Sequence, residues 1–142
     1  MEATSTDNRK GITVVIPNYN GIRFLGDCLE ALGRQEEGTP PYSILVVANG
    51  SEDGSLALLA ESFPEVEVEA LPENTGFCHA VNVGIRRAKT PYVILLNNDT
   101  RVYPGFVKGL FQAMEREKDA FSVSARMLLW DDTERMDDGG AR

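Results

Sequence analysis

Apolar runs typical of strands alternate with amphipathic helical patterns along most of the chain, and this alternation limits the folds available to it. The apolar runs are 11–17, 42–48, 66–71, 91–96 and about 120–130, and helical spacing fills the intervals at about 24–32, 56–63, 77–88 and 106–114. Strands that alternate with single helices through short connections pair in parallel and place helices on both sheet faces. The sequence therefore predicts an α/β fold with a doubly wound, mostly parallel sheet.

Two of the expected strands indicate their places in that sheet. Residues 66–71, VEVEAL, alternate apolar and acidic side chains, which predicts one solvated face and a position at the sheet edge. Residues 91–96, PYVILL, are apolar on both faces, which is typical of the interior of a parallel sheet. Helix 77–88 has a regular apolar stripe that begins at Phe77, and Asn74 or Thr75 is suited to cap its start.

Length and composition predict one globular domain. The chain has 142 residues, of which 42% are hydrophobic and 25% are charged, and this is enough to form a core. We assign residues 11–130 to the domain and residues 1–10 to a disordered lead-in. Residues 131–142 form an acidic polar segment directly after a strand, which indicates a truncation point.

Charge and residue pattern argue against several classes of protein. A net charge of −8 and a pI near 4.6 offer no basic surface to a nucleic acid. No signal peptide is recognisable and no run approaches the roughly 18 apolar residues of a membrane span, so we expect no transmembrane segment and a cytoplasmic location. Cys28 and Cys78 are predicted to be buried reduced thiols, and a single histidine argues against structural zinc.

Four of the expected strands end in loops rich in asparagine, glycine and acidic residues. These loops are PNYNG (17–21), ANGSEDGS (48–55), PENTG (72–76) and NNDT (97–100). Each alone is an ordinary turn sequence. However, the carboxyl ends of parallel strands meet at one edge, where open α/β sheets bind ligands. The four loops together predict one binding site.

Both the motifs that are missing and the residues that are present limit the chemical class of ligand that this site can bind. The first strand is not followed by G-x-G-x-x-G, the chain has no G-K-[ST] phosphate loop, and the only histidine, His79, falls on the polar side of its helix. The sheet edge offers Tyr19 as an aromatic platform beside amides and hydroxyls, and Asp99 as a carboxylate. Such a set can stack a nucleobase and hold a divalent cation against a diphosphate.

Four segments together resemble the nucleotide-binding half of a family 2 glycosyltransferase. They are VVIPNYNG, VVANGSEDGS, ENTGFCHAVNVG and LLNNDTRVYPGF, and their order and spacing extend from residue 12 to about residue 130. That family is inverting and has the GT-A fold, whose nucleotide-binding half is Rossmann-like. The segments are most similar to its rhamnosyltransferase-like and galactofuranosyltransferase-like branch of bacterial envelope enzymes. The resemblance implies that this chain is an N-terminal nucleotide-sugar-binding portion.

The resemblance also implies which residues bind the donor. Tyr19 would stack on the base, Asn49 would hydrogen-bond the base edge, and Asn98 would lie near the ribose. The complete implied set is Pro17, Asn18, Tyr19, Asn49, Ser51, Asp53, Asn74, Gly76, Asn82 and Asn98. Some of these residues also have a purely structural interpretation. Tyr19 would then be a half-buried tyrosine at a strand end, and Asn82 an exposed amide on a helix. Asn49, Ser51 and Asp53 would form a turn followed by a helix cap.

Asp99 occupies the place of the family's D-x-D-like motif in Asn97-Asn98-Asp99. By resemblance it would coordinate Mg²⁺ or Mn²⁺ bridging the two donor phosphates. A lone carboxylate is a poor cage, so the ion is expected to bind well only together with the diphosphate. The alternative for Asp99 is a turn or helix cap ahead of Pro104.

Two departures from the family pattern bear on function. Ala48 stands where the family usually has an aspartate, which weakens the expectation of ordinary nucleoside recognition. The family's general base lies well downstream of the metal motif, so the catalytic residue is unknown and is expected beyond residue 142. Asp131, Asp132, Asp137 and Asp138 qualify only by residue type, and a solvated acidic tail is the simpler interpretation.

These inferences predict the donor-binding portion of an inverting glycosyltransferase of bacterial cell-envelope polysaccharide synthesis, located in the cytoplasm or at the inner membrane surface. Expected partners are a UDP- or dTDP-linked sugar and a carbohydrate or lipid-linked acceptor, with self-association through apolar surface around Leu128, Leu129 and Trp130. The alternative is a truncated or degenerate non-catalytic domain that binds a nucleotide or a partner. A sugar nucleotidyltransferase would need cations after the first strand, which PNYNG does not supply.

Overall fold

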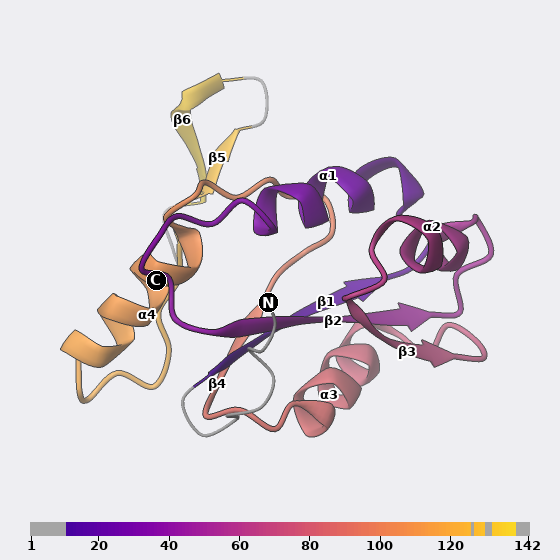
Figure 1. Cartoon of the computed structure of the whole chain (residues 1–142), viewed down its shortest axis with the longest axis horizontal. Coiled ribbons are helices and arrows are strands. Elements are labelled where there is room, and N and C mark those ends of the chain that lie inside the picture. The colour runs from indigo at the N-terminus through magenta and orange to yellow at the C-terminus, as the bar shows by residue number, and fades with distance from the viewer. Residues whose placement is uncertain (1–10, 126, 130–131, 139–142) are drawn as a thin grey trace.

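The computed structural model describes residues 11–125, 127–129 and 132–138, with side chains described as far as residue 125. Four strands form one all-parallel sheet in the order β3-β2-β1-β4: β1 Ile12–Asn18, β2 Tyr42–Asn49, β3 Glu67–Leu71 and β4 Tyr92–Leu95. The helices are α1 Ile22–Leu32, α2 Ser55–Ser62, α3 Phe77–Arg87 and α4 Phe106–Arg116. The predicted doubly wound α/β architecture is confirmed (Figure 1).

Two apolar clusters, one on each face of the sheet, show that helices cover both faces. Val14 and Ile16 of β1 pack in one cluster with buried residues of α1, α2 and α4. Val15 of the same strand packs in the other cluster with Ala80 of α3. Because successive side chains of a strand point to opposite faces, an unbroken run of β-branched residues in β1 supplies both layers.

The edge positions of the sheet differ in part from expectation. The prediction that 66–71 lies at an edge is confirmed, because β3 pairs with β2 alone among the described strands. The prediction that 91–96 lies in the interior is wrong for this part of the chain, where β4 pairs only with β1. As a result Val93 is 36% and Leu95 is 51% exposed. Apolar side chains on both faces do not reveal how many neighbours a strand has.

The prediction of a fifth strand at about 120–130 is also wrong. Residues 120–125 form no strand, and β5 Met127–Leu129 instead pairs antiparallel with β6 Asp132–Asp138 in a separate two-stranded sheet (Figure 1). β6 lies within the acidic polar segment 131–142. The expectations for residues 1–10 and for the apolar surface around Leu128, Leu129 and Trp130 lie outside the described side chains.

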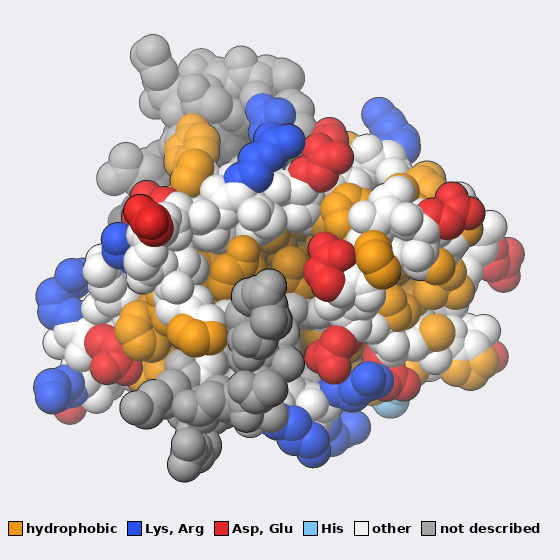
Figure 2. Space-filling view, in the orientation of Figure 1, with side chains coloured by type: hydrophobic (Ala, Val, Ile, Leu, Met, Phe, Trp, Pro, Cys, Tyr) orange, Lys and Arg blue, Asp and Glu red, His pale blue; other side chains and the backbone are white. Residues whose placement is uncertain are grey.

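The molecular surface mixes charged and apolar side chains. On the face shown in Figure 2, acidic and basic side chains of the described residues lie interspersed around apolar ones. Cys28 is buried as predicted, but Cys78 is exposed, so the prediction for that thiol is wrong; both are free. Within the described ranges, none of the helices combines the length and the apolar character that crossing a bilayer requires.

The first residue of α1 is hydrogen-bonded to the carboxylate of Asp53, which lies 31 residues later in the chain. Oδ2 of Asp53 accepts a hydrogen bond of 2.9 Å from the Ile22 N–H, and its Oδ1 accepts from the Ser55 N–H and hydroxyl. Partial burial alone would raise the pKa of Asp53, but these hydrogen bonds outweigh it and lower the pKa below its ordinary value. The ionised form is therefore the one that joins α1 to the loop after β2.

α3 approaches the sheet closely through Gly84. A Cβ added there would lie 2.3 Å from Cγ1 of Val15 and 3.2 Å from Cγ2 of Val47. We predict that Gly84→Ala lowers the free energy of unfolding by about 1–3 kcal/mol, since overpacking outweighs the gain in helix propensity. Urea denaturation measures this. The matched control is Gly109→Ala on the exposed side of α4, where nothing lies within 4 Å; it should stabilise, and similar effects for both variants would contradict the prediction.

Asp53→Asn should remove one acceptor from the start of α1 and destabilise the domain by about 1 kcal/mol at neutral pH. A lowered pKa in the folded state gives stability that is fully present above the unfolded pKa of about 3.9 and is lost as the pH falls through the folded value. The difference in unfolding free energy between wild type and variant should therefore shrink below about pH 4. Denaturation curves from pH 3 to pH 7 test this, with the exposed Asp27→Asn as control; a difference independent of pH would refute it.

Candidate functional site

A cleft of about 390 Å³ opens at the carboxyl ends of β1, β2 and β4. Its position is the one at which parallel α/β sheets bind ligands. All predicted site residues line it except Ser51, Asp53 and Asn82. The lining residues are Pro17, Asn18, Tyr19, Asn49, Asn74, Gly76, Phe77, Asn97, Asn98 and Asp99.

Asn18, the last residue of β1, joins three of the four loops. Its side chain is only 1% exposed. Oδ1 accepts a hydrogen bond of 2.7 Å from Nδ2 of Asn98, and Nδ2 donates to Oγ of Ser51 at 3.2 Å. The Ser51 hydroxyl donates in turn to the Asn18 carbonyl and accepts from the Asn20 N–H, both at 3.1 Å. Ser51 therefore holds Asn18 in place by hydrogen bonds and does not itself line the cleft.

Asn49, at the end of β2, organises the loop that leads to α3. Its Oδ1 accepts from the N–H and the hydroxyl of Thr75, at 3.0 and 3.1 Å. Its Nδ2 donates to Oδ1 of Asn74 at 3.0 Å and to the Gly76 carbonyl at 3.2 Å. A carboxamide has two donor hydrogens and two acceptor lone pairs, and all four are used here. Contact between Asn49 and a base edge stays a prediction, and it would require one of these bonds to be exchanged.

The loop after β3 reaches α3 through Gly76. Oδ1 of Asn74 accepts from the Gly76 N–H at 2.9 Å. Gly76 has φ 95° and ψ 157°, which only glycine adopts readily. The prediction that Asn74 or Thr75 caps α3 is wrong, since Gly76 is the N-cap residue and no described side chain caps it. Asn82 is exposed farther along α3 and does not line the cleft.

Two exposed aromatic side chains line the cleft. Tyr19 follows β1 and is 51% exposed, and Phe77 begins α3 and is 61% exposed. The sequence pattern counted Phe77 in the apolar stripe of its helix, which implies burial, whereas the side chain is exposed. An aromatic residue directly after a turn glycine, in the first turn of a helix at the binding edge, was the signal that could have identified it. Rings held this way can stack on a planar or apolar ligand surface.

Asp99 is exposed and is the one charged residue among the described residues that line the cleft. The turn that carries it is closed by the Thr100 hydroxyl, which donates to the Asn97 carbonyl at 2.7 Å. No group of three His, Cys, Asp or Glu side chains in the described part of the chain could enclose a metal ion. A divalent ion needs about six oxygen ligands, so Asp99 fits an ion only if a ligand such as a diphosphate supplies others.

Cys28 of α1 lies beneath this turn. Its thiol is 3.8 Å from the Asn97 carbonyl and 4.0 Å from the Thr100 hydroxyl. Burial raises the pKa of the Cys28 thiol to about 11, with a further contribution from the charge of Asp99. The thiol is therefore neutral at physiological pH and acts as a weak donor and packing group.

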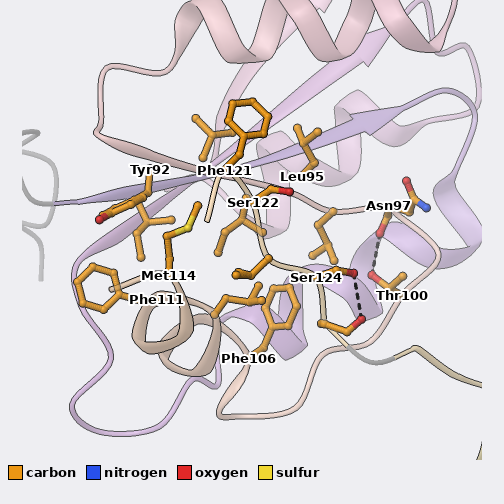
Figure 3. A pocket seen from close by; sticks show the side chains of 17 residues that line it. Tyr92, Leu95, Asn97, Thr100, Phe106, Phe111, Met114, Phe121, Ser122 and Ser124 are labelled. Atoms are coloured by element: carbon orange, nitrogen blue, oxygen red, sulfur yellow. Dashed lines mark hydrogen bonds between the residues drawn. The ribbon is translucent and has the colours of Figure 1, made fainter. Parts of the chain in front are cut away.

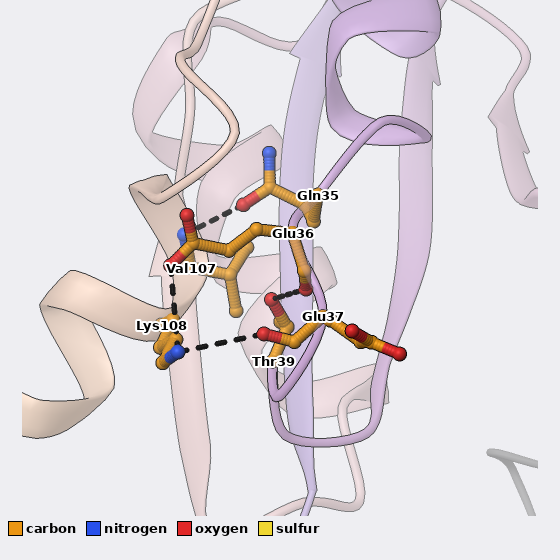
Figure 4. A network of polar contacts seen from close by, with 6 residues as sticks. All are labelled: Gln35, Glu36, Glu37, Thr39, Val107 and Lys108. Carbon is orange, nitrogen blue, oxygen red and sulfur yellow. Dashed lines mark hydrogen bonds and ion pairs between the residues drawn. The ribbon is translucent and has the colours of Figure 1, made fainter.

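The far end of the Asp99 loop is held by the loop that follows α1 (Figure 4). Oε1 of Gln35 accepts from the Val107 N–H in the first turn of α4 at 2.9 Å, and its Nε2 donates to the Tyr103 carbonyl at 3.0 Å. Nζ of Lys108 lies 3.5 Å from Oε2 of Glu36. The segment between β4 and α4 is thus anchored at both ends.

A second cavity of about 380 Å³ lies between β4, α4 and residues 121–125. Figure 3 shows its mainly apolar lining, which includes Leu95, Phe106, Phe111 and Met114. Tyr92 and Phe111 meet edge to face with ring centroids 5.6 Å apart. This second cavity has few of the polar groups that a phosphate or a cation requires, so it is not the candidate site.

Comparisons with known proteins agree with this geometry. Glycosyltransferase GlyG of Streptococcus pneumoniae is 29% identical over 126 residues, which are 87% of this chain and 41% of that protein. The putative teichuronic acid biosynthesis glycosyltransferase TuaG of Bacillus subtilis is 26% identical over 129 residues, 89% of this chain and 50% of that protein. The chain thus spans half or less of the length of these curated relatives.

Solved structures share the fold. S. aureus TarS 1-349 in complex with UDP superposes with a TM-score of 0.68 at 18% identity, covering 83% of this chain and 39% of that one. The mannosyltransferase PcManGT of Pyrobaculum calidifontis, in complex with GDP-Man and Mn²⁺, gives 0.67 at 21% identity, covering 85% and 36%. The family described as glycosyl transferase family 2 matches residues 13–138. Sequence, sheet topology and cleft therefore converge, and the chain belongs to glycosyl transferase family 2.

Proposed function

We propose that this domain binds a nucleoside diphosphate sugar in the cleft and forms the donor-binding part of an inverting glycosyltransferase. The observation that carries the proposal is that an exposed aromatic ring, Tyr19, and an exposed carboxylate, Asp99, line one cavity at the carboxyl edge of the sheet. The nucleotide complexes of TarS and PcManGT, which share the fold, support it.

Each end of the cleft suits one part of such a donor. Tyr19 stacks on the nucleobase, beside Pro17, and Phe77 offers a second apolar surface. Asp99 faces the diphosphate together with Mg²⁺ or Mn²⁺, which when bound neutralises the charge that develops on the leaving diphosphate. Asp99 would hold that ion and so orient this end of the donor.

The sugar-transfer step needs a base that this cleft does not supply. An acceptor hydroxyl oxygen forms a bond to the anomeric carbon, the bond from that carbon to the diphosphate oxygen breaks, and the hydroxyl proton passes to a carboxylate. Among the described lining residues Asp99 is the only carboxylate, and it is assigned to the diphosphate. We propose that the base and the acceptor site lie outside the described cleft.

The acceptor class follows from relatives rather than from the cleft. Relatives of this chain include proteins named for teichoic acid and teichuronic acid synthesis. We propose a carbohydrate or lipid-linked acceptor of the bacterial cell envelope, a UDP- or dTDP-linked donor, and action on the cytoplasmic side at the inner membrane surface.

One observation favours the alternative of a non-catalytic nucleotide- or partner-binding domain. Ala48 is buried at 1% exposure, and its neighbour Asn49 has no free hydrogen-bonding capacity. Base selection then depends on shape and stacking more than on a carboxylate. Binding of several nucleoside diphosphates with similar affinity, without sugar transfer by the natural protein, would favour this alternative.

Asp99→Asn should abolish the metal-dependent part of UDP binding. Removing the charge leaves a neutral amide that holds a divalent ion poorly, so UDP affinity measured with Mn²⁺ should fall at least about tenfold. Affinity without metal should stay the same or rise, because repulsion from the diphosphate is lost. Calorimetry with UDP, dTDP, GDP and ADP tests this, with Asp27→Asn as the matched surface control. Equal metal dependence in wild type and Asp99→Asn would contradict the assignment.

Tyr19→Ala should weaken UDP binding equally with and without Mn²⁺. Stacking of a base on an aromatic ring contributes about 1–3 kcal/mol, so a loss of about 5- to 150-fold in affinity is expected. Tyr103→Ala is the control, since Tyr103 is 62% exposed and does not line the cleft. Unchanged UDP affinity in Tyr19→Ala would place the base elsewhere.

A further inference from the structure

Asn18 and Asn98 form a side-chain amide pair between the ends of β1 and β4. The pair is the 2.7 Å hydrogen bond from Nδ2 of Asn98 to Oδ1 of Asn18, which connects residues 80 positions apart. Asn98 immediately precedes Asp99. The amide pair therefore fixes the backbone position from which the cleft's carboxylate extends.

Gly21 leaves the space in which this amide pair lies. A Cβ added at Gly21 would be 2.1 Å from Nδ2 of Asn98 and 2.6 Å from Oδ1 of Asn18. Both distances are far below van der Waals contact. Gly21 has φ −102° and ψ 31°, which residues with side chains can also adopt. Space for the amide pair, and not backbone conformation, is thus what requires glycine at this position.

Gly21 is itself held in place, so it cannot move aside for a side chain. Its carbonyl accepts hydrogen bonds from the N–H groups of Phe24 and Leu25, both at 3.0 Å, as the N-cap of α1. The next residue, Ile22, donates to Asp53. Asn18 is buried and bonded to Ser51. A methyl group at position 21 therefore separates the two amides: it displaces the side chain of Asn98, which is the less buried partner, and crowds Oδ1 of Asn18.

We propose that Gly21, Asn18 and Asn98 act together as a positioning device for Asp99. This inference rests on the proposed function, in which Asp99 faces the metal and the diphosphate. It reassigns Asn98 from a ribose contact to a positioning residue, since its amide donor is directed at Asn18. Gly21 controls metal-dependent donor binding without touching the donor.

The test compares Gly21→Ala with a matched glycine of the same helix. Gly26→Ala is the control, because a Cβ there meets only Cδ2 of Leu58 at 3.9 Å, an ordinary contact. In Gly21→Ala the gain in UDP affinity on adding Mn²⁺ should fall about 10- to 100-fold, the range for residues that orient metal ligands. UDP affinity without metal should change less than about twofold. Gly26→Ala should behave as wild type in both measurements.

Asn98→Ala and a double variant distinguish a role of the amide pair in positioning Asp99 from general damage to the fold. Asn98→Ala removes the donor without inserting any atom, so it should reproduce the loss of the metal-dependent gain. The double variant Gly21→Ala/Asn98→Ala should be no worse than Asn98→Ala alone if Gly21 acts through the amide pair. Equal losses of affinity with and without metal, or additive effects in the double variant, would overturn the proposal.

A ligand-free measurement separates failure of this inference from failure of the proposed function. By NMR, the Asn98 side-chain amide should exchange slowly in wild type and Gly26→Ala, and at least about tenfold faster in Gly21→Ala, with lower order at residues 97–100. Unchanged exchange and order in Gly21→Ala would overturn the positioning role whether or not UDP binds. If wild type shows no metal-dependent UDP binding, the proposed function of Asp99 fails, and the positioning role of Gly21, Asn18 and Asn98 is overturned with it. Slow exchange of the Asn98 side-chain amide would then show only that the amide pair connects β1 and β4 structurally.

Discussion

A buried carboxamide must find its hydrogen bonds inside the protein, because each unpaired group costs about 1–3 kcal/mol. Asn18 and Asn49 are 1% and 4% exposed at the ends of the two central strands, and both meet this demand with groups from other loops. Asn18 bonds to Asn98 and Ser51, and Asn49 bonds to Asn74, Thr75 and Gly76. The four loops are therefore tied to each other through two side chains. The shape of the cleft follows from satisfying these amides rather than from any bound ligand.

This arrangement divides the cleft into a hydrogen-bonded floor and exposed side chains that are available to contact a ligand. The amides that form its floor are occupied by the chain, whereas Tyr19, Phe77 and Asp99 stand exposed above them. A neutral, hydrogen-bonded floor does not repel a diphosphate, and a single carboxylate does not hold a cation tightly without one. Metal and donor are thus expected to bind together, which links Asp99 to the donor's charge rather than to a permanently bound ion.

Much of the fold could be predicted because the hydrophobic period changes clearly between strands and helices. The edge position of β3 was readable from alternating valine and glutamate, and the cleft from polar loops at strand ends. The place of β4 was not, because an apolar strand looks the same whether one or two neighbours cover it. Helical periodicity assigned Phe77 and Cys78 to buried positions, but both side chains are exposed in the first turn of α3. The donor and acceptor pairing of Asn49 depends on backbone groups that no residue pattern specifies.

The contact of Gln35 with the first turn of α4 has a consequence for how the molecule assembles. The N–H of Val107 is bonded to a side chain 72 residues earlier in the chain, and the amide pair at the other end of the same segment closes an even longer loop. Contacts of such high sequence separation form only after the large entropy of loop closure has been overcome. We expect the segment that carries Asp99 to become ordered late in folding, after β1, β2 and α1 have come together. The pairing of β4 with β1 closes a loop of the same length as the amide pair does. Chains that have collapsed but have not yet paired these two strands would then contain the other three strands without a complete cleft.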